Sequence, residues 1–199
     1  MSSAYQHLQT TLNQYYALSD KAWQAYLACC SIKEIAKGEV LYSLGERPKS
    51  FMFIHQGLMR AYVIDDDGHE YNKNFFAEGR FPGCMSALLN GEPTTIAIEA
   101  VERCQVVEIN HQQFRAALFN DSDLMAFHIH YLEKHWLLEK EPKEISYLQY
   151  EAKARYLKFL ANYHTLLPRL PQYHIASYLG ITATQLSRIK KSLSTASLT

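Results

Sequence analysis

The sequence lacks the features that mark membrane, secreted and zinc-binding proteins. No apolar run reaches the roughly 18 residues that a membrane-crossing helix needs, so no membrane partner is expected. The N-terminus has no basic segment followed by an apolar one, which argues against a signal peptide and favours a cytoplasmic location. The four cysteines are few and form no Cys-x-x-Cys pair, which argues against a disulfide framework and a zinc ribbon.

Acidic residues are absent after Glu151. Up to that residue, 13 lysines and arginines stand against 20 acidic residues, a net charge of −7; the rest of the chain has 7 basic residues and no acid, a net charge of +7. A basic segment on an acidic body is typical of a module that binds a polyanion such as nucleic acid. A solvated basic tail would give the same division, so charge alone leaves both interpretations open.

Glycines are scarce, with 8 in 199 residues, but five of them separate short apolar or alternating runs between residues 32 and 109. Asp65 to Gly68 has the composition of a hairpin turn, because glycine adopts positive φ at little cost. Many short strands at this spacing predict an antiparallel barrel or jelly roll. The expected strands span residues 40–42, 51–54, 58–64, 71–76, 95–99 and 105–109.

Helical periodicity flanks the strand region on both sides. The first thirty residues are expected to be helical, with Ser19 as the N-cap of a helix over 20–30. After the strands we expect a helix over 111–119 capped by Asn110, a longer one from Asp121-Ser122 to a break or kink at Pro142, and a third over 144–163.

The longer helix carries an apolar seam. Its members fall at i, i+4, i+7 and i+11, a spacing that gathers side chains on one helix face. They are Met125, Ile129, Leu132 and Trp136. The seam would fit equally well against the chain's own barrel or against a second copy of the chain, in which case it would be a dimer contact.

The most specific motif lies at residues 171–191. Pro171 suits the first turn of a helix, Gly180 suits a left-handed C-terminal position, and Thr182 suits the N-cap of a second helix. Two short helices joined by a glycine turn are typical of the helix-turn-helix, although an ordinary helical hairpin has the same outline. The basic outer face of the second helix favours DNA binding.

Six residues of this motif are expected to contact DNA: Thr182, Thr184, Gln185, Arg188, Lys190 and Lys191. Arg188 is the expected base reader, because a guanidinium can bond O6 and N7 of guanine together; a phosphate contact is its alternative role. Thr182 is placed to hold a phosphate at the helix N-terminus, and Thr184 and Gln185 to contact base edges. The two lysines are expected on the phosphate backbone.

With helices, barrel, long helix and helix-turn-helix in this order, the chain resembles the Crp/Fnr superfamily of transcription regulators over nearly its whole length. Residues 37–41, 45–46, 53–60 and 67–70 are similar to the glycine-punctuated strands of its cyclic-nucleotide-binding barrel. The resemblance implies an α+β fold with an antiparallel β jelly-roll barrel. Its parts would be N-terminal helices and the sensor barrel over 1–121, a dimerisation helix over 122–141, and a helical, winged helix-turn-helix-like domain over 143–199.

The same resemblance implies the partners. They are a second copy of the chain, double-stranded DNA with a pseudo-palindromic operator, RNA polymerase, and a small-molecule effector that the sequence does not identify.

The stretch that matches the family's phosphate-binding cassette departs from the family pattern. Cys84 stands where the family has the Glu that holds the ribose, and Thr94 where it has the Arg that pairs the cyclic phosphate. A hydroxyl does not replace an arginine fork on a buried phosphate, so we expect no ordinary cyclic-nucleotide binding. The degenerate pocket would comprise Gly83, Cys84, Met85, Thr94 and Thr95. The nearest substitute cations are Arg60, Arg80 and Arg103, each expected on a solvated barrel edge.

An enzyme is the alternative from a different class. A cupin-like metalloenzyme needs His-x-His with further His and Glu ligands from neighbouring strands. The chain's His-x-His, His128-Ile129-His130, falls on an expected helix, where the two rings point to different faces. We therefore expect a non-enzyme without metal or other cofactor. A third interpretation is a cyclic-nucleotide or other small-ligand module whose helix-turn-helix is degenerate.

Overall fold

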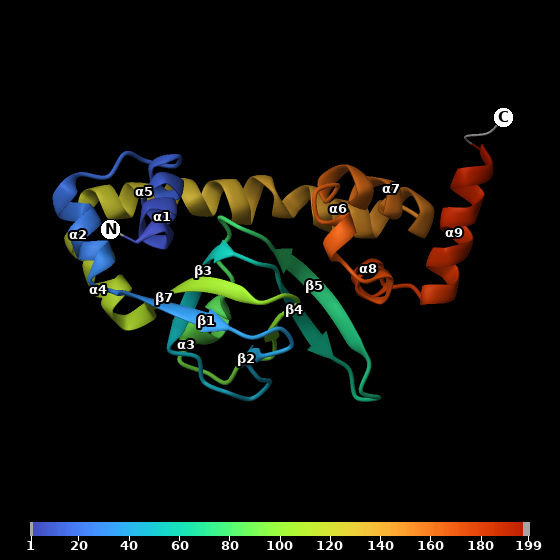
Figure 1. The fold of residues 1–199 in the computed structure, drawn as a ribbon, viewed down its shortest axis with the longest axis horizontal. Coiled ribbons are helices and arrows are strands. Elements are labelled where there is room, and N and C mark those ends of the chain that lie inside the picture. The colour runs from blue at the N-terminus through green and yellow to red at the C-terminus, as the bar shows by residue number, and fades with distance from the viewer. Residues whose placement is uncertain (1, 197–199) are drawn as a thin grey trace. The chain divides into compact units, whose positions relative to one another are not determined.

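The computed structural model describes residues 2–196, and its elements follow the expected order (Figure 1). Helices α1 (Ser3–Asn13) and α2 (Asp20–Leu27) precede the strands. The strands are β1 (Cys30–Ile35), β2 (Val40–Tyr42), β3 (Ser50–Gln56), β4 (Met59–Ile64), β5 (Glu70–Phe76), β6 (Ala97–Ala100) and β7 (Cys104–Asn110), with helix α3 (Met85–Asn90) between β5 and β6.

The segments after β7 are helical. They are α4 (His111–Asn120), α5 (Ser122–Leu132), the π-helix η1 (Glu133–Leu138), α6 (Lys140–Gln149), α7 (Ala152–Asn162), the 3-10 helix η2 (Leu167–Arg169), α8 (Gln172–Leu179) and α9 (Ala183–Ala196). None of the helices in the described part of the chain combines the length and the apolar character that a membrane span requires.

The chain divides into two compact units, each described by itself. Residues up to Ala61 and 75–141 form the first unit, and residues 62–74 with those from Pro142 onward form the second.

The strands form two sheets, in the orders β1-β7-β3 and β2-β6-β4-β5. In the first, β7 pairs antiparallel with both neighbours, so that Val107 faces Ile32 on one side and Phe53 on the other. Side chains alternate across a strand, which gives the first sheet two apolar faces. One face, with Met52, Ile54 and Val106, joins the barrel interior. This is the expected antiparallel jelly roll.

The other face of the first sheet is covered by helices. Phe53 and Val107 point to this side, and α1, α2, α4 and α5 pack their apolar residues on it. The largest fully buried side chains of these helices are Leu8, Leu12, Tyr26 and Leu124. The N-terminal helices therefore complete a core that the barrel alone would leave open to water.

Side-chain caps fix the helix starts as expected. Ser19 Oγ accepts from Ala22 N at 3.3 Å to cap α2, and Asn110 Oδ1 accepts from Gln113 N at 3.0 Å to cap α4. The expected end of α2 at residue 30 is wrong. The helix stops at Leu27, because Cys30 already pairs with Ile109 in β1.

The break expected at Pro142 takes the form of a π-helical turn before the proline. Within this segment Glu139 N donates to Lys134 O, five residues back, at 3.0 Å. Pro142 itself lies in the first turn of α6, where a missing backbone N–H leaves no hydrogen bond unmade. The wider π turn also relieves the crowding that a proline ring imposes on the turn before it.

The second unit is helical apart from residues 62–74. The single helix expected over 144–163 is instead two helices, α6 and α7, separated at Tyr150 and Glu151. Between Pro142 and Ala196 no strand is present, so the β-hairpin wing of the expected winged motif is not found in that range. The β-structure of this unit is the end of β4 and most of β5, which lie within residues 62–74.

Candidate DNA-binding site and effector pocket

The two-helix motif at the C-terminus has the geometry of a helix-turn-helix. Helix α8 follows Pro171 and buries Ile175, Ala176 and Leu179, which are each at most 2% exposed. It ends at Gly180, whose φ of 65° and ψ of 34° lie in the left-handed region. Gly180 N donates to Ser177 O and Ile181 N to Ala176 O, the pair of bonds that defines a Schellman C-terminus. These two hydrogen bonds therefore fix the turn between α8 and α9.

A capping box opens α9. Gln185 N donates to Thr182 Oγ1 at 3.1 Å, and in return Thr182 N donates to Gln185 Oε1 at 2.9 Å. Each side chain thus satisfies a backbone N–H that the first helical turn leaves unpaired. The N-cap role expected for Thr182 is confirmed. The base contact expected for Gln185 stays a prediction and competes with this pair.

The outer face of α9 presents the other expected residues to solvent. Thr184, Arg188 and Lys191 are exposed, whereas Leu186 on the inner face is 1% exposed. Lys190 Nζ donates to Gln172 Oε1 at 2.9 Å and so connects α9 to the start of α8. The spacing places Thr184, Arg188 and Lys191 on one side of the helix, as the motif requires; their contact with DNA stays a prediction.

Two residues outside the motif brace it, and neither carries a recognisable signal in the sequence. Tyr147 of α6 donates its hydroxyl to Tyr178 O at 2.9 Å, and Arg155 of α7 donates Nη2 to Leu179 O at 3.0 Å. Both acceptors are last-turn carbonyls of α8 that no helical N–H can reach. No spacing rule connects such distant positions, so the pattern gave no signal for them.

The two cassette residues that depart from the family pattern are buried and bond the backbone of the barrel. Cys84 is 2% exposed and Thr94 4% exposed. Cys84 Sγ donates to Ile96 O at 3.4 Å, and Thr94 Oγ1 donates to the same carbonyl at 2.9 Å while it accepts from Ile96 N at 3.1 Å. Both side chains thus bond the backbone of a neighbouring residue of the barrel.

The other cassette residues have structural roles. A Cβ added at Gly83 would lie 2.7 Å from Phe51 Cβ, so the close approach of the segment before α3 to strand β3 requires glycine. Met85 begins α3 and packs on the apolar core beneath the helices, and Thr95 is exposed. These contacts give the cassette residues structural roles, and a ligand pocket formed by the five residues stays a prediction.

All three candidate cations lie near a carboxylate, and they differ in exposure: Arg60 is buried, Arg80 half-buried and Arg103 exposed. Arg60 is 5% exposed, and its Nη2 lies 2.5 Å from Glu99 Oε2. Arg80 Nη2 lies 2.8 Å from Glu139 Oε2. The expectation of a solvated edge is right for Arg103, whose side chain is 80% exposed, and wrong for the other two, because each meets a carboxylate that offsets its burial.

Glu139 is the centre of a small charged network in the first unit. His135 Nδ1 lies 2.9 Å from Glu139 Oε2, and the Nε2 of the same ring is 2.6 Å from the hydroxyl of Tyr15. Burial opposes the charge on Glu139, but its contacts with His135 and Arg80 outweigh burial and lower its pKa to about 2. The network holds the π-helical segment to the end of α1.

The seam of the long helix is open to solvent. Its side chains are exposed by 39% at Met125, 54% at Ile129, 38% at Leu132 and 40% at Trp136. On the opposite side of α5, Leu124 and Phe127 are 0% and 3% exposed. The helix is thus apolar on two faces, and the face expected to form the dimer is not covered by the chain's own barrel. Its contact with a second copy stays a prediction.

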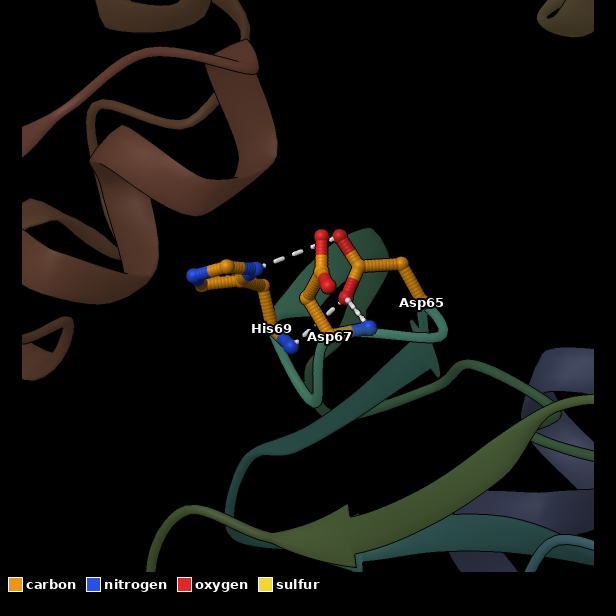
Figure 2. Close-up of side chains that lie close together, drawn as sticks. All are labelled: Asp65, Asp67 and His69. Carbon is orange, nitrogen blue, oxygen red and sulfur yellow. Dashed lines mark hydrogen bonds and ion pairs between the residues drawn. The ribbon is translucent and has the colours of Figure 1, made fainter.

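A group of exposed side chains at the β4–β5 turn has the residue types of a cation site (Figure 2). Ligand-type atoms of Asp65, Asp67 and His69 all lie within 4.8 Å of one another. Asp65 Oδ1 accepts from the backbone N of Asp67 at 3.1 Å and of His69 at 2.8 Å. These bonds account for the cluster as the closure of a tight turn, without a metal ion.

The expected divergence of the His-x-His pair is also seen. His128 packs its ring against Phe114, whereas His130 lies 3.4 Å from Glu133 on an exposed face. The rings of this pair do not form a cupin-like metal site.

The structure contains a jelly-roll barrel, a long helix and a C-terminal helix-turn-helix, in the order that the resemblance to the Crp/Fnr family implies. Residues 32–121 match the sequence model of the cyclic nucleotide-binding domain, and the solved structures that resemble the chain include regulators of that family. The expected α+β fold with a cyclic-nucleotide-binding-like barrel is therefore confirmed, and membership of the Crp/Fnr superfamily stays a prediction.

Individual structures cover most of the chain. FixK2 from Bradyrhizobium japonicum is 20% identical, with a TM-score of 0.70 over 84% of this chain and 86% of its own. The c-di-GMP-responsive global regulator CLP from Xanthomonas campestris is 16% identical, with a TM-score of 0.71 over 90% and 94%. The Thermus thermophilus catabolite activator protein is 15% identical, with a TM-score of 0.57 over 94% and 88%. No curated protein sequence matches the chain significantly. At these identities the likeness establishes a shared fold.

Proposed function

We propose that this protein is a homodimeric, sequence-specific DNA-binding transcription regulator whose barrel has lost the usual cyclic-nucleotide chemistry. The observation that carries the proposal is helix α9. It is capped at its start, anchored by Leu186, and exposes Thr184, Arg188 and Lys191 on its outer face. A helix presented in this way fits the major groove.

The charge of the chain after Glu151 supports DNA as the partner. All seven basic residues after Glu151 belong to the second unit, and the sequence has no acidic residue after that position. Such a segment attracts phosphates, and the resulting binding weakens as salt releases the counterions.

Dimer formation is supported by the open seam. Four large apolar side chains lie exposed on one face of α5 and η1 while the opposite face is buried. An exposed apolar stripe of this kind is typical of a helix that packs against another helix. A two-fold dimer would present two copies of α9 to a pseudo-palindromic operator.

The state of the cassette argues against an ordinary cyclic-nucleotide effector. The positions of the family's Glu and Arg are held by Cys84 and Thr94, which both bond Ile96. A cyclic phosphate buried there would have no cation beside it, at a cost of several kcal/mol. CLP, a regulator responsive to c-di-GMP, shares this fold, so we propose that another small molecule or none acts here. RNA polymerase and the effector stay predictions of the family resemblance.

Selection from a random DNA pool tests the proposal. The full-length protein should enrich a pseudo-palindromic sequence and bind it at least about 1,000-fold more tightly than a scrambled duplex. Enrichment without any shared sequence, or no retention of DNA at low salt, would contradict it. The second outcome would favour the small-ligand module with a degenerate helix-turn-helix.

A further inference from the structure

Helix α8 covers part of a sheet edge within the second unit. Strand β5 lies last in the order β2-β6-β4-β5, so one side of its backbone has no neighbouring strand. Ser177 Oγ donates to Glu70 O at 2.7 Å and accepts from Asn72 N at 2.9 Å. One hydroxyl of α8 therefore satisfies two backbone groups that an edge strand would otherwise leave to water.

A buried amide strengthens this contact. Asn72 is 4% exposed and His174 5% exposed. Asn72 Nδ2 donates to His174 O at 3.0 Å and lies 3.2 Å from His174 Nδ1. An amide nitrogen can only donate, so the ring nitrogen is the acceptor. Breaking this pair would leave buried polar groups unpaired, which costs more than an exposed hydrogen bond does.

A third residue of the same strand face extends the contact. Asn74 Oδ1 lies 3.4 Å from both Lys143 Nζ in α6 and the hydroxyl of Tyr163, which follows α7. Positions 70, 72 and 74 alternate onto one face of β5, so this face meets α6, α7 and α8 in turn. Asparagine is depleted in strands, and these contacts explain why β5 contains two within three residues.

The contact leaves the recognition surface open. Its members on α8 are His174 and Ser177, whereas the residues expected on DNA belong to α9 and are exposed. A DNA duplex therefore has no need to displace the hairpin segment. This distinguishes a positioning contact from an inhibitory one.

We propose that Asn72 and Ser177 are positioning residues that lock α8 to the β4–β5 hairpin and so fix the spacing between half-sites that the dimer accepts. We call this set of hydrogen bonds the hairpin latch. The inference rests on the proposed DNA-binding function. In a dimer, two recognition helices must meet successive major grooves, and a helix-turn-helix that pivots loses this discrimination. A fixed helix-turn-helix also avoids the entropic cost of ordering it on binding.

The test compares operators of different spacing. Ser177→Ala removes the hydroxyl, Ser177→Thr retains it, and Ser192→Ala is the matched control, because Ser192 Oγ bonds a carbonyl of its own helix. Each protein is titrated with the selected operator and with versions one base pair longer and shorter. Wild type, Ser177→Thr and Ser192→Ala should prefer one spacing by about tenfold or more, and Ser177→Ala should reduce that preference to about twofold or less.

Asn72→Ala is the second variant, and hydrogen exchange checks that both variants fold. In Ser177→Ala the amide of Asn72 should exchange at least about tenfold faster than in Ser192→Ala, while core amides keep their protection. A folded Ser177→Ala and a folded Asn72→Ala that both retain the spacing preference would overturn the latch and leave the proposed function standing. A wild-type protein that selects no DNA sequence would overturn both.

Discussion

The cassette of the barrel and the recognition helix α9 differ in where their polar side chains lie. In the cassette, Cys84 and Thr94 are buried and both donate to Ile96 O. On α9, Thr184 and Arg188 are exposed, and Thr182 and Gln185 form a capping box at the start of the helix. The polar groups of the first region bond their own backbone, and those of the second are exposed to solvent. The contrast supports the proposal of a regulator that recognises DNA and lacks the usual nucleotide chemistry.

The largest effect is expected from a charge in the seam. Trp136→Glu places a carboxylate where the dimer would bury an indole, and an unpaired buried charge costs several kcal/mol. We expect a shift from dimer to monomer and at least about a 100-fold loss of operator affinity, since one helix-turn-helix has to bind alone. Light scattering and a binding titration measure both. Gln112→Glu, at an exposed position of α4, should leave them unchanged. A Trp136→Glu protein that stays dimeric would contradict the assignment of the seam.

The next largest effect is expected from the recognition helix α9. Arg188→Ala should reduce discrimination between the operator and a sequence altered at the contacted base, by about 1–3 kcal/mol. Weak binding through phosphate contacts should remain and should fall steeply with salt. Anisotropy titrations at two salt concentrations check this, with Ser187→Ala as the exposed neighbouring control. Unchanged discrimination would remove Arg188 from the role of base reader.

A smaller effect, on the stability of the protein, is expected from a substitution in the cassette. Gly83→Ala adds a Cβ that would lie 2.7 Å from Phe51 Cβ in a packed region. Overpacking of this kind costs about 1–3 kcal/mol, so we expect a lower free energy of unfolding in urea. Ser86→Ala, at an exposed position of α3, serves as the control. Equal stability of the two variants would show that the cassette is looser than its contacts indicate.

The smallest effect is a pH dependence of stability. Glu139 has a pKa of about 2 in the folded protein against an ordinary value of 4.5. Burial raises this pKa, but the contacts with His135 and Arg80 lower it by more. A lowered folded pKa stabilises the protein above about pH 4.5, and this contribution is lost as the pH falls toward 2. Urea unfolding at pH 6 and pH 3 should show a larger loss for wild type than for Glu139→Gln. The difference should be modest because the Glu139 side chain is 36% exposed. An equal loss in both proteins would contradict the lowered pKa.

Local signals in the sequence predicted most of the fold. Strands between glycine turns and helices behind Ser19, Asn110 and Asp121 lie close to their expected positions, because turn and cap chemistry acts over a few residues. Strand β1 gave no comparable signal, since four of its six residues are exposed and form no apolar run. The end of α2 was misplaced for the same reason: the pairing of Cys30 with Ile109 is a long-range contact.

In the candidate site too, the sequence predicted local features but not contacts between distant residues. The capping box is a local pattern, Thr-x-x-Gln, that the sequence contained at Thr182 and Gln185. The braces on α8 and the hairpin latch are not local, since Asn72 and His174 are 102 residues apart in the chain. The burial of Arg60 and the partial burial of Arg80 also depend on carboxylates from distant segments. Residue types and spacing carry no information about such pairs.

One binding titration tests the account most directly. The full-length protein is titrated with its selected operator and with a scrambled duplex, each in the absence and presence of cyclic AMP. The cyclic AMP concentration is about 100 times the dissociation constant of a ligand that binds at micromolar concentration. We predict a large preference for the operator that cyclic AMP leaves unchanged. A preference for the operator that appears only with cyclic AMP would contradict the claim that the cassette binds no cyclic nucleotide. No preference in either condition would contradict the claim that α9 recognises DNA.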